Sequence, residues 1–242
     1  MSGVIAVVDL GLAPYVEVLE LQRELCRRRV AGEERGDVLL LVEHEPVVTL
    51  GRSTLSTSLP LPRALLEARG LAVHEVERGG DVTLHAPGQL VGYPIFDLGG
   101  WHHDLHWYLR QLEAAVIGAV AEFGITAGRN SGKTGVWVDA ASGKGPPGGE
   151  QRKIASIGIH VKRWVTLHGF ALNVTNDLAL FDLIVPCGIH GVTMTSVDRE
   201  TGRTDAELGA EVRRAMVANL GRTFDREMVP GRLGDLAGVV TG

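Results

Sequence analysis

Residues 152–174, RKIASIGIHVKRWVTLHGFALNV, decide the fold of this 242-residue chain. Two runs rich in β-branched and apolar residues, 152–163 and 165–174, stand almost end to end, which predicts two strands of a β-hairpin. Further strands are expected at 4–10, 37–44, 47–51, 71–77, 89–98 and 134–138, and helices at 14–32, 62–70, 104–123 and 205–224. Because these elements do not repeat as βαβ units, we expect an α/β (α+β) fold in which helices pack on a mixed, largely antiparallel sheet.

The first strand of the hairpin carries a lysine at its start. Lys153 has the same parity as Ala155 and Ile157, and a strand alternates its faces with period two. The pattern therefore puts Lys153 on the apolar side of the strand, away from Ser156 and Gly158. A lysine there lies either at the rim of the sheet, with its ammonium in water, or in a pocket, and periodicity favours the rim.

The strand at 89–98 contains two residues that disturb β-structure. Gly92 and Pro94 both fall inside it, so we expect this strand to be bent or to lie at an edge of the sheet. Residues 139–151, DAASGKGPPGGEQ, have the composition of a loop between two strands. We expect a single catalytic domain over residues 1–225 and a weakly patterned tail over 226–242.

The composition excludes several classes of protein. The chain is 45% hydrophobic and 22% charged, with a net charge of −5, which argues against general binding of nucleic acids or membrane surfaces. No secretory signal and no apolar stretch of membrane-spanning length is visible. Two cysteines are too few for a disulfide framework or a four-thiolate zinc site, so we expect a reducing, cytoplasmic setting.

The two cysteines differ in their surroundings. Cys187 follows an apolar run and stands between Pro186 and Gly188, in a turn where backbone N–H groups could face an oxyanion. Cys26 lies within a predicted helix among charged residues, and nothing marks it as a nucleophile. A lysine ammonium favours the reactive thiolate, so Lys153 is a chemical partner for Cys187 if the fold brings them together.

Four segments together resemble a known family. They are EHEPVVTLGR (43–52), RGGDVTLHAPGQLVGYP (78–94), KIASIGIHV with LHGFALNV (153–174) and FDLIVPCGI (181–189). In this order they are similar to the lipoyl(octanoyl) transferases, over residues 5 to 220. The resemblance implies the fold shared by lipoate and biotin protein ligases. It also implies transfer of an octanoyl group from acyl carrier protein to a lysine of a lipoyl domain.

The resemblance also implies roles for individual residues. Cys187 is implied as the nucleophile that carries the acyl thioester, and Lys153 as the group that lowers the pKa of that cysteine and moves protons. The implied acceptors are the lipoyl domains of 2-oxoacid dehydrogenase complexes and the glycine cleavage H protein. We expect a monomer that needs no cofactor and no metal. The implied substrate-binding residues are Arg78, Gly79, Gly80, Asp81, Val82, Thr83, Leu84, His85, Ser156, Ile157, Gly158, His168, Gly169, Phe170 and Ala171.

Some roles stay open at this level. His85 and His168 could each orient Lys153, bond the acyl carbonyl or hold a glycine-rich turn. Ala86 replaces the usual family glycine in HAPGQ. This alanine would strain the backbone if the position has positive φ, and would narrow the pocket by a methyl group if the glycine only makes space. The alternative functions are an ATP-dependent lipoate or biotin ligase, a non-catalytic acyl-binding protein, and a hydrolase that uses Cys187 with His168.

Overall fold

The computed structural model describes residues 3–34, 36–130, 132–138, 151–185 and 192–236. The strands are β1 (Val4–Ala13), β2 (Asp37–His44), β3 (Val47–Leu50), β4 (Ala72–Glu75), β5 (Val82–His85), β6 (Gln89–Ile95), β7 (Ala127–Asn130), β8 (Lys133–Val138), β9 (Arg152–Lys162), β10 (Val165–Asn173), β11 (Thr193–Met194) and β12 (Glu227–Pro230). The helices are α1 (Tyr15–Ala31), α2 (Arg63–Ala68), α3 (Leu105–Ala121), α4 (Val197–Thr201) and α5 (Leu208–Phe224).

The strands form one large sheet and one small sheet. The large sheet has the order β12-β1-β2-β6-β10-β9-β8-β7, and β11 pairs with β9 outside this path. Pairing is antiparallel from β2 to β7 and parallel at β12-β1-β2 and β11-β9. The small sheet has the order β4-β3-β5. The predicted class, a mixed and largely antiparallel sheet packed with helices, is confirmed.

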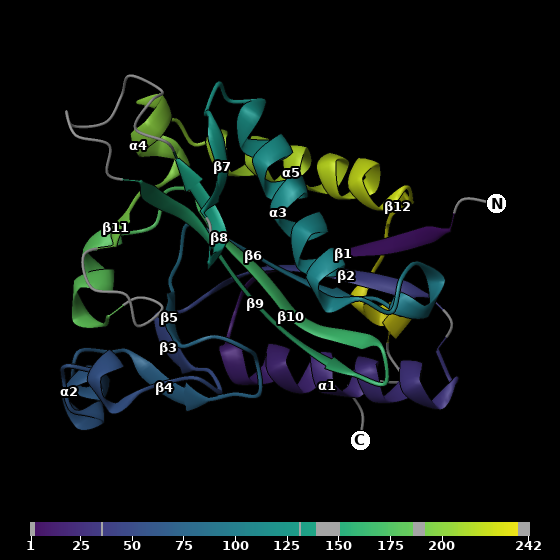
Figure 1. The fold of residues 1–242 in the computed structure, drawn as a ribbon, viewed down its shortest axis with the longest axis horizontal. Coiled ribbons are helices and arrows are strands. Elements are labelled where there is room, and N and C mark those ends of the chain that lie inside the picture. Colours follow the sequence, from purple (N-terminus) through teal and green to yellow (C-terminus); the bar gives the residue numbers. More distant parts are fainter. Residues whose placement is uncertain (1–2, 35, 131, 139–150, 186–191, 237–242) are drawn as a thin grey trace.

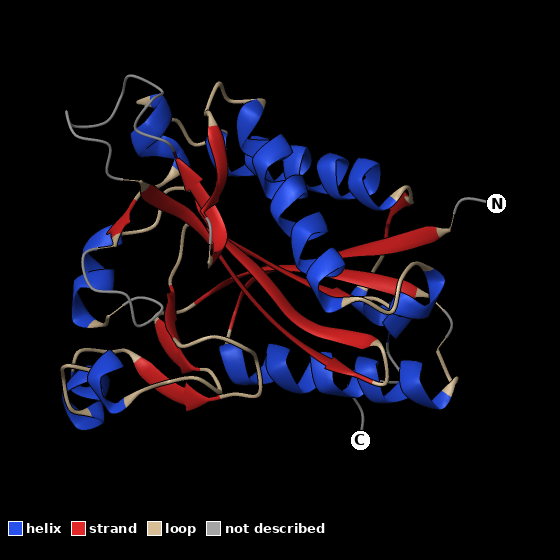
Figure 2. Cartoon of the chain, viewed as in Figure 1, coloured by secondary structure: helices blue, strands red, loops and turns tan. Residues whose placement is uncertain are grey.

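Helices cover both faces of the large sheet (Figures 1 and 2). Helices α3 and α5 pack together on one face, and α1 lies along the other. Alternate residues of β2 serve the two layers: Leu39 and Leu41 join the core under α3 and α5, whereas Val38 and Leu40 join the core under α1. Both layers bury apolar side chains, which supplies the main driving force for folding.

The hairpin predicted at 152–174 is present and lies inside the large sheet. Strands β9 and β10 pair from Lys162↔Val165 to Ala155↔Leu172. The two residues of the turn, Arg163 and Trp164, have φ values of +48° and +68°. Positive φ at both central residues is the pattern of a type I′ turn, whose twist matches that of paired strands.

A β-bulge interrupts the alternation of β9. Strand β8 pairs Val136 with Ala155 but pairs Trp137 with Lys153, so β9 has one extra residue at Ile154. Both Ile154 and Ala155 consequently lie in the core under α3 and α5. One extra residue in a strand makes the side chains beyond it point to the opposite face of the sheet from the one that strict alternation predicts. Lys153 therefore leaves the apolar row that strict period two predicts and faces the same side as Ser156.

Strand β6 lies in the middle of the sheet, between β2 and β10, so the expectation that it could lie at an edge is wrong. Gly92 is needed because the ring of Phe170 covers it: a Cβ at Gly92 would lie 2.2 Å from Phe170 Cζ. Pro94 is tolerated because the ladder between β6 and β10 ends at Gly92. Beyond that point the hydroxyl of Thr166 donates to the Pro94 carbonyl over 2.6 Å.

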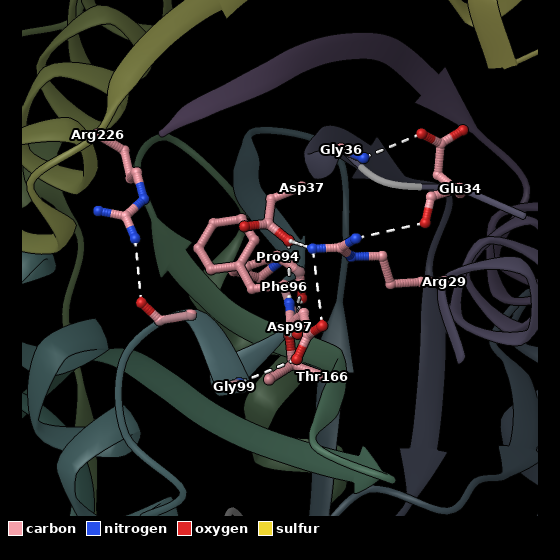
Figure 3. Close-up of polar contacts among 11 residues, drawn as sticks. Arg29, Glu34, Gly36, Asp37, Pro94, Phe96, Asp97, Gly99, Thr166 and Arg226 are labelled. Atoms are coloured by element: carbon pink, nitrogen blue, oxygen red, sulfur yellow. Dashed lines mark hydrogen bonds and ion pairs between the residues drawn. The ribbon is translucent and has the colours of Figure 1, made fainter. Parts of the chain in front are cut away.

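The same corner of the sheet holds a partly buried polar cluster (Figure 3). The backbone N–H of Asp97 donates to Asp37 Oδ1 over 3.0 Å, and the Arg29 guanidinium lies 3.2 Å from that oxygen. Burial raises the pKa of Asp37, and the arginine and the amide oppose the shift. These contacts fasten the C-terminal part of α1 to β2 where β6 ends, so they fix the helix on its face of the sheet.

The residues after 225 also contribute to the sheet. Strand β12 pairs in parallel with β1, from Glu227↔Val4 to Pro230↔Val7. The sequence pattern leaves this strand unassigned because it is short and lies at an edge. The division into a catalytic domain and a tail stays a prediction. Among the described residues, no helix combines the length and the apolar character needed to cross a bilayer.

Candidate active site

One cavity collects most of the residues that the sequence singles out. It has a volume of about 260 Å³ and lies on the face of the hairpin that carries Ser156 and Gly158. Its walls come from the 78–83 segment and His85, from the β9–β10 hairpin, and from β6, β8 and the start of α1. The sequence-selected residues in its lining are Arg78, Gly80, Asp81, Val82, Thr83, His85, Lys153, Ser156, Ile157, Gly158, His168, Gly169, Phe170 and Ala171.

Two of the implied substrate-binding residues are absent from the lining. Leu84 is fully buried in the core beneath the small sheet. The backbone N–H of Gly79 donates to the Ile159 carbonyl over 2.8 Å and so ties the 78–81 segment to β9. Leu84 lies between Thr83 and His85, which line the cavity, and its side chain belongs to the core together with that of Val82. The substrate-binding roles of the lining residues stay predictions.

Lys153 lies in the wall of the cavity and not at the rim of the sheet. Its side chain is only 1% exposed, and its ammonium lies 5.3 Å from the centroid of the Trp137 ring. Gly135 makes room for it, because a Cβ there would lie 2.7 Å from Lys153 Cε. The rim interpretation is therefore wrong, and the bulge at Ile154 is the reason.

Cys187 lies outside the described residues, together with the rest of segment 186–191. The described chain on either side of that segment is held by backbone hydrogen bonds. On one side the Val185 N–H donates to the Ser58 carbonyl over 2.9 Å. On the other side β11 pairs with the start of β9, with Met194 opposite Lys153. The role of Cys187 stays a prediction.

Two charged residues of the 78–81 segment brace the small sheet. The Arg78 guanidinium donates to the carbonyl and the hydroxyl of Thr49 over 2.6 and 2.9 Å. The carboxylate of Asp81 accepts the Ser58 hydroxyl over 2.6 Å and the Val82 N–H over 2.7 Å. These bonds satisfy buried charged groups. They hold the segment as a rigid wall of the cavity.

His168 occupies a strained backbone position. Its φ is +57°, although it lies within β10, and its N–H donates to Gln22 Oε1 of α1 over 3.0 Å. Burial lowers the pKa of His168 to about 3. Its Nε2 lies 3.9 Å from Glu77, too far for a hydrogen bond. With a neutral ring, this contact is not an ion pair.

Comparison with known proteins matches most of the chain to one family. The model of the lipoyl protein ligase A/B catalytic domain matches residues 14–220. An octanoyltransferase of Solibacter usitatus is 45% identical over 223 residues, which cover 92% of this chain and 94% of the relative. One of Gloeobacter violaceus is 49% identical over 182 residues, 75% of each chain. The chain belongs to this family, among its octanoyltransferases.

Solved structures support the fold of the family. A bipartite lipoate protein ligase from Thermoplasma acidophilum superposes with a TM-score of 0.71 at 17% identity, over 96% of this chain and 87% of that one. A lipoate-protein ligase A solved with bound ATP superposes with a TM-score of 0.67 at 16% identity, over 96% of this chain and 89% of that one. The fold is thus the lipoate ligase fold, as the sequence resemblance implies.

Sequence reasoning missed part of the lining. Tyr15, Val91, Tyr93, Gly132, Lys133 and Thr134 also face the cavity. Tyr15 stands at the start of α1, and its ring stacks with those of His74 and His85 at centroid distances of 6.0 and 5.9 Å. The helix pattern assigns Tyr15 only to a helix start. A signal was available in Tyr93, which shares the parity of the apolar Val91 on β6.

The backbone and the burial of Ala86 show what its replacement of the family glycine does. Ala86 is buried, lacks a positive φ and does not line the cavity, so this replacement of the family glycine neither strains the turn nor narrows the site. His102 and His103 pack against Trp107 and Trp164. Across the described residues, no group of three or more His, Cys, Asp or Glu side chains is placed to hold a metal ion.

Acid is expected to unfold the protein through its buried histidines. Burial lowers the pKa of His44 to about 4 and the pKa values of His85 and His168 to about 3. Between the unfolded value of about 6.5 and these folded values, only the unfolded chain binds the protons. The free energy of unfolding should therefore fall with falling pH, by up to about 1.4 kcal/mol per pH unit for each histidine.

Urea denaturation at pH 7, 6 and 5 measures this slope. A free energy of unfolding that stays constant from pH 7 to pH 5 would contradict the burial of three neutral imidazoles. Substituting His44 with glutamine should reduce the slope by up to about 1.4 kcal/mol per pH unit, the contribution of one bound proton. A slope that keeps its full size in this variant would contradict the assignment of His44.

Proposed function

We propose that this octanoyltransferase moves an octanoyl group from the thioester of an acyl carrier protein to a lysine of a lipoyl domain, through a thioester on Cys187. The chain is an acyltransferase of the family described above. One observation carries the proposal beyond the family name. A buried lysine ammonium lies in the wall of a partly apolar cavity, beside the strand that resumes after the segment that holds Cys187.

In the first step the Cys187 thiolate attacks the carbonyl carbon of the carrier thioester. A new carbon–sulfur bond forms, the old one breaks, and the Lys153 ammonium protonates the departing thiolate of the carrier. One thioester replaces another, so this step is nearly balanced in free energy. A nucleophilic cysteine of this kind divides a difficult transfer into two easier ones.

In the second step the amine of the acceptor lysine attacks the acyl-enzyme. The neutral Lys153 takes the proton from the amine, a carbon–nitrogen bond forms, and Cys187 leaves as a thiolate. The amide is more stable than the thioester, which makes the step favourable without ATP. The enzyme returns to its starting protonation state.

The cavity supplies a place for the acyl chain. Its lining includes the apolar side chains of Val82, Val91, Ile157, Phe170 and Ala171. Each methylene transferred from water to such a surface contributes roughly 0.8 kcal/mol. The proposed acceptors are the lipoyl domains of 2-oxoacid dehydrogenase complexes and the glycine cleavage H protein.

The test is transfer without nucleotide. Purified protein incubated with octanoyl carrier protein should gain one octanoyl group, which hydroxylamine removes, as seen by intact mass. Adding a lipoyl domain should move that group to its lysine. Product formed only from free octanoate and ATP would support a ligase instead, and release of free octanoate would support a hydrolase.

A further inference from the structure

His85 lines the cavity, and one nitrogen of its ring is hydrogen-bonded to a neighbouring side chain. It is the last residue of β5, it is 6% exposed, and it is part of the cavity lining. Its Nδ1 lies 2.8 Å from Gln89 Oε1. The proposed mechanism leaves this buried imidazole without a function.

Backbone carbonyl groups fix which nitrogen of His85 carries the proton. The side-chain amide nitrogen of Asn173 donates to the Thr195 carbonyl over 3.0 Å, so Asn173 Oδ1 is an acceptor. Gln89 Nε2 donates to that Oδ1 over 2.9 Å and to the Leu84 carbonyl over 3.3 Å. Gln89 Oε1 therefore faces His85 as an acceptor, and Nδ1 of the imidazole must be the donor.

The tautomer leaves Nε2 with a lone pair. Burial lowers the pKa of His85 to about 3, and the nearby His44, Arg78 and His168 act in the same direction. The ring is neutral near pH 7, so Nε2 accepts hydrogen bonds and has no proton to donate. It cannot hold the acyl carbonyl or an oxyanion, which need donors. It is also far too weak a base to hold the proton of an amine.

We propose that His85 Nε2 accepts a hydrogen bond from the amine of the acceptor lysine and positions it for attack on the acyl-enzyme. An attacking amine aims its lone pair at the carbonyl carbon and keeps two N–H bonds to be satisfied. One serves the proton transfer to Lys153, and the other needs an acceptor. The Asp81 carboxylate, also in the lining, already accepts bonds from Ser58 and Val82. This inference rests on the proposed function and assigns His85 to its second step.

The experiment measures the two steps separately in His85→Leu. Release of carrier thiol reports formation of the acyl-enzyme, and mixing isolated acyl-enzyme with a lipoyl domain reports the second step. The first step should stay within about threefold of wild type, and the second should slow at least about tenfold, the effect of one lost hydrogen bond of about 1.4 kcal/mol. His85→Gln, which places an amide oxygen near the position of Nε2, should recover part of the loss. The matched control is His74→Leu, because His74 also stacks with the Tyr15 ring but lies outside the lining.

The outcomes separate the two proposals. Equal loss in both steps, or an unchanged second step, would overturn the role of His85. No acyl-enzyme in the wild type would instead remove the proposed function. The histidine ¹⁵N chemical shifts of the wild-type protein give a test that does not depend on a folded variant. An Nε2–H tautomer of His85 would overturn the inference, and an Nδ1–H tautomer is the expected result.

Discussion

Replacing Cys187 with serine is expected to abolish the acyl-enzyme and to lower octanoyl transfer by at least about 10³-fold. A serine hydroxyl is not ionised near neutral pH, whereas a thiol has a substantial thiolate fraction once a cation is nearby. The measurement is intact mass after incubation with octanoyl carrier protein, followed by the initial rate of lipoyl-domain octanoylation. The mass of the variant should stay that of the free protein.

The other cysteine of the chain gives the matched control. Cys26 lies in α1, is 2% exposed, and has a pKa that burial raises to about 11. Cys26→Ala should therefore form the acyl-enzyme at the wild-type level, although it loses some stability to the small cavity it leaves. An adduct that survives in Cys187→Ser and disappears in Cys26→Ala would identify Cys26 as the nucleophile and overturn the proposed mechanism.

Replacing Lys153 with methionine is expected to separate activity from stability. Transfer should fall by about 10²- to 10⁴-fold, because both steps of the proposed mechanism move a proton through this amine. The fold should survive, since methionine keeps most of the apolar stem and its sulfur can contact the Trp137 ring. The rate of transfer and the thermal unfolding midpoint are the two measurements.

Lys162 serves as the control for Lys153, because it lies at the exposed end of the same strand. Lys162→Met should transfer octanoyl at the wild-type rate. Full activity in Lys153→Met would remove the lysine from the mechanism. A large drop in its unfolding midpoint would show that the residue is needed for folding, and the loss of transfer could then not be assigned to proton movement.

The sequence predicts the architecture better than the position of single side chains. Strong periodic patterns over 152–174 and 104–123 predict the hairpin and α3, and both are confirmed. Residue alternation fails at Ile154, because a bulge depends on the partner strand β8 and leaves no mark in the sequence of β9. Local propensity also fails at Gly92 and Pro94, whose tolerance depends on Phe170 and Thr166 of another strand.

The candidate site shows the same division. The motifs select most of the cavity lining, because they are short segments that each approach the site from one strand or turn. Tyr15 and Lys133 are missed because they reach the cavity from elements whose own patterns indicate only a helix start and a short strand. The hydrogen-bond chain from His85 through Gln89 to Asn173 joins residues that lie up to 88 positions apart, counted from the numbering. Periodicity within one element cannot show such a chain.

The bulge at Ile154 determines where the side chains of two neighbouring cations, Arg152 and Lys153, point. Arg152 turns toward α4 and forms a buried, two-pronged pair with Glu200 over 3.0 Å, while Lys153 turns toward the cavity. Consecutive residues of a regular strand also point to opposite sides, but without the extra residue their destinations would be exchanged. The ion pair of Arg152 and the cavity position of Lys153 therefore depend on the number of residues in β9 as much as on their identity. Inserting or deleting one residue at the bulge would keep both side chains but exchange the sides of the strand to which they point. A sequence alignment that misplaces a gap here would likewise assign each residue to the wrong side.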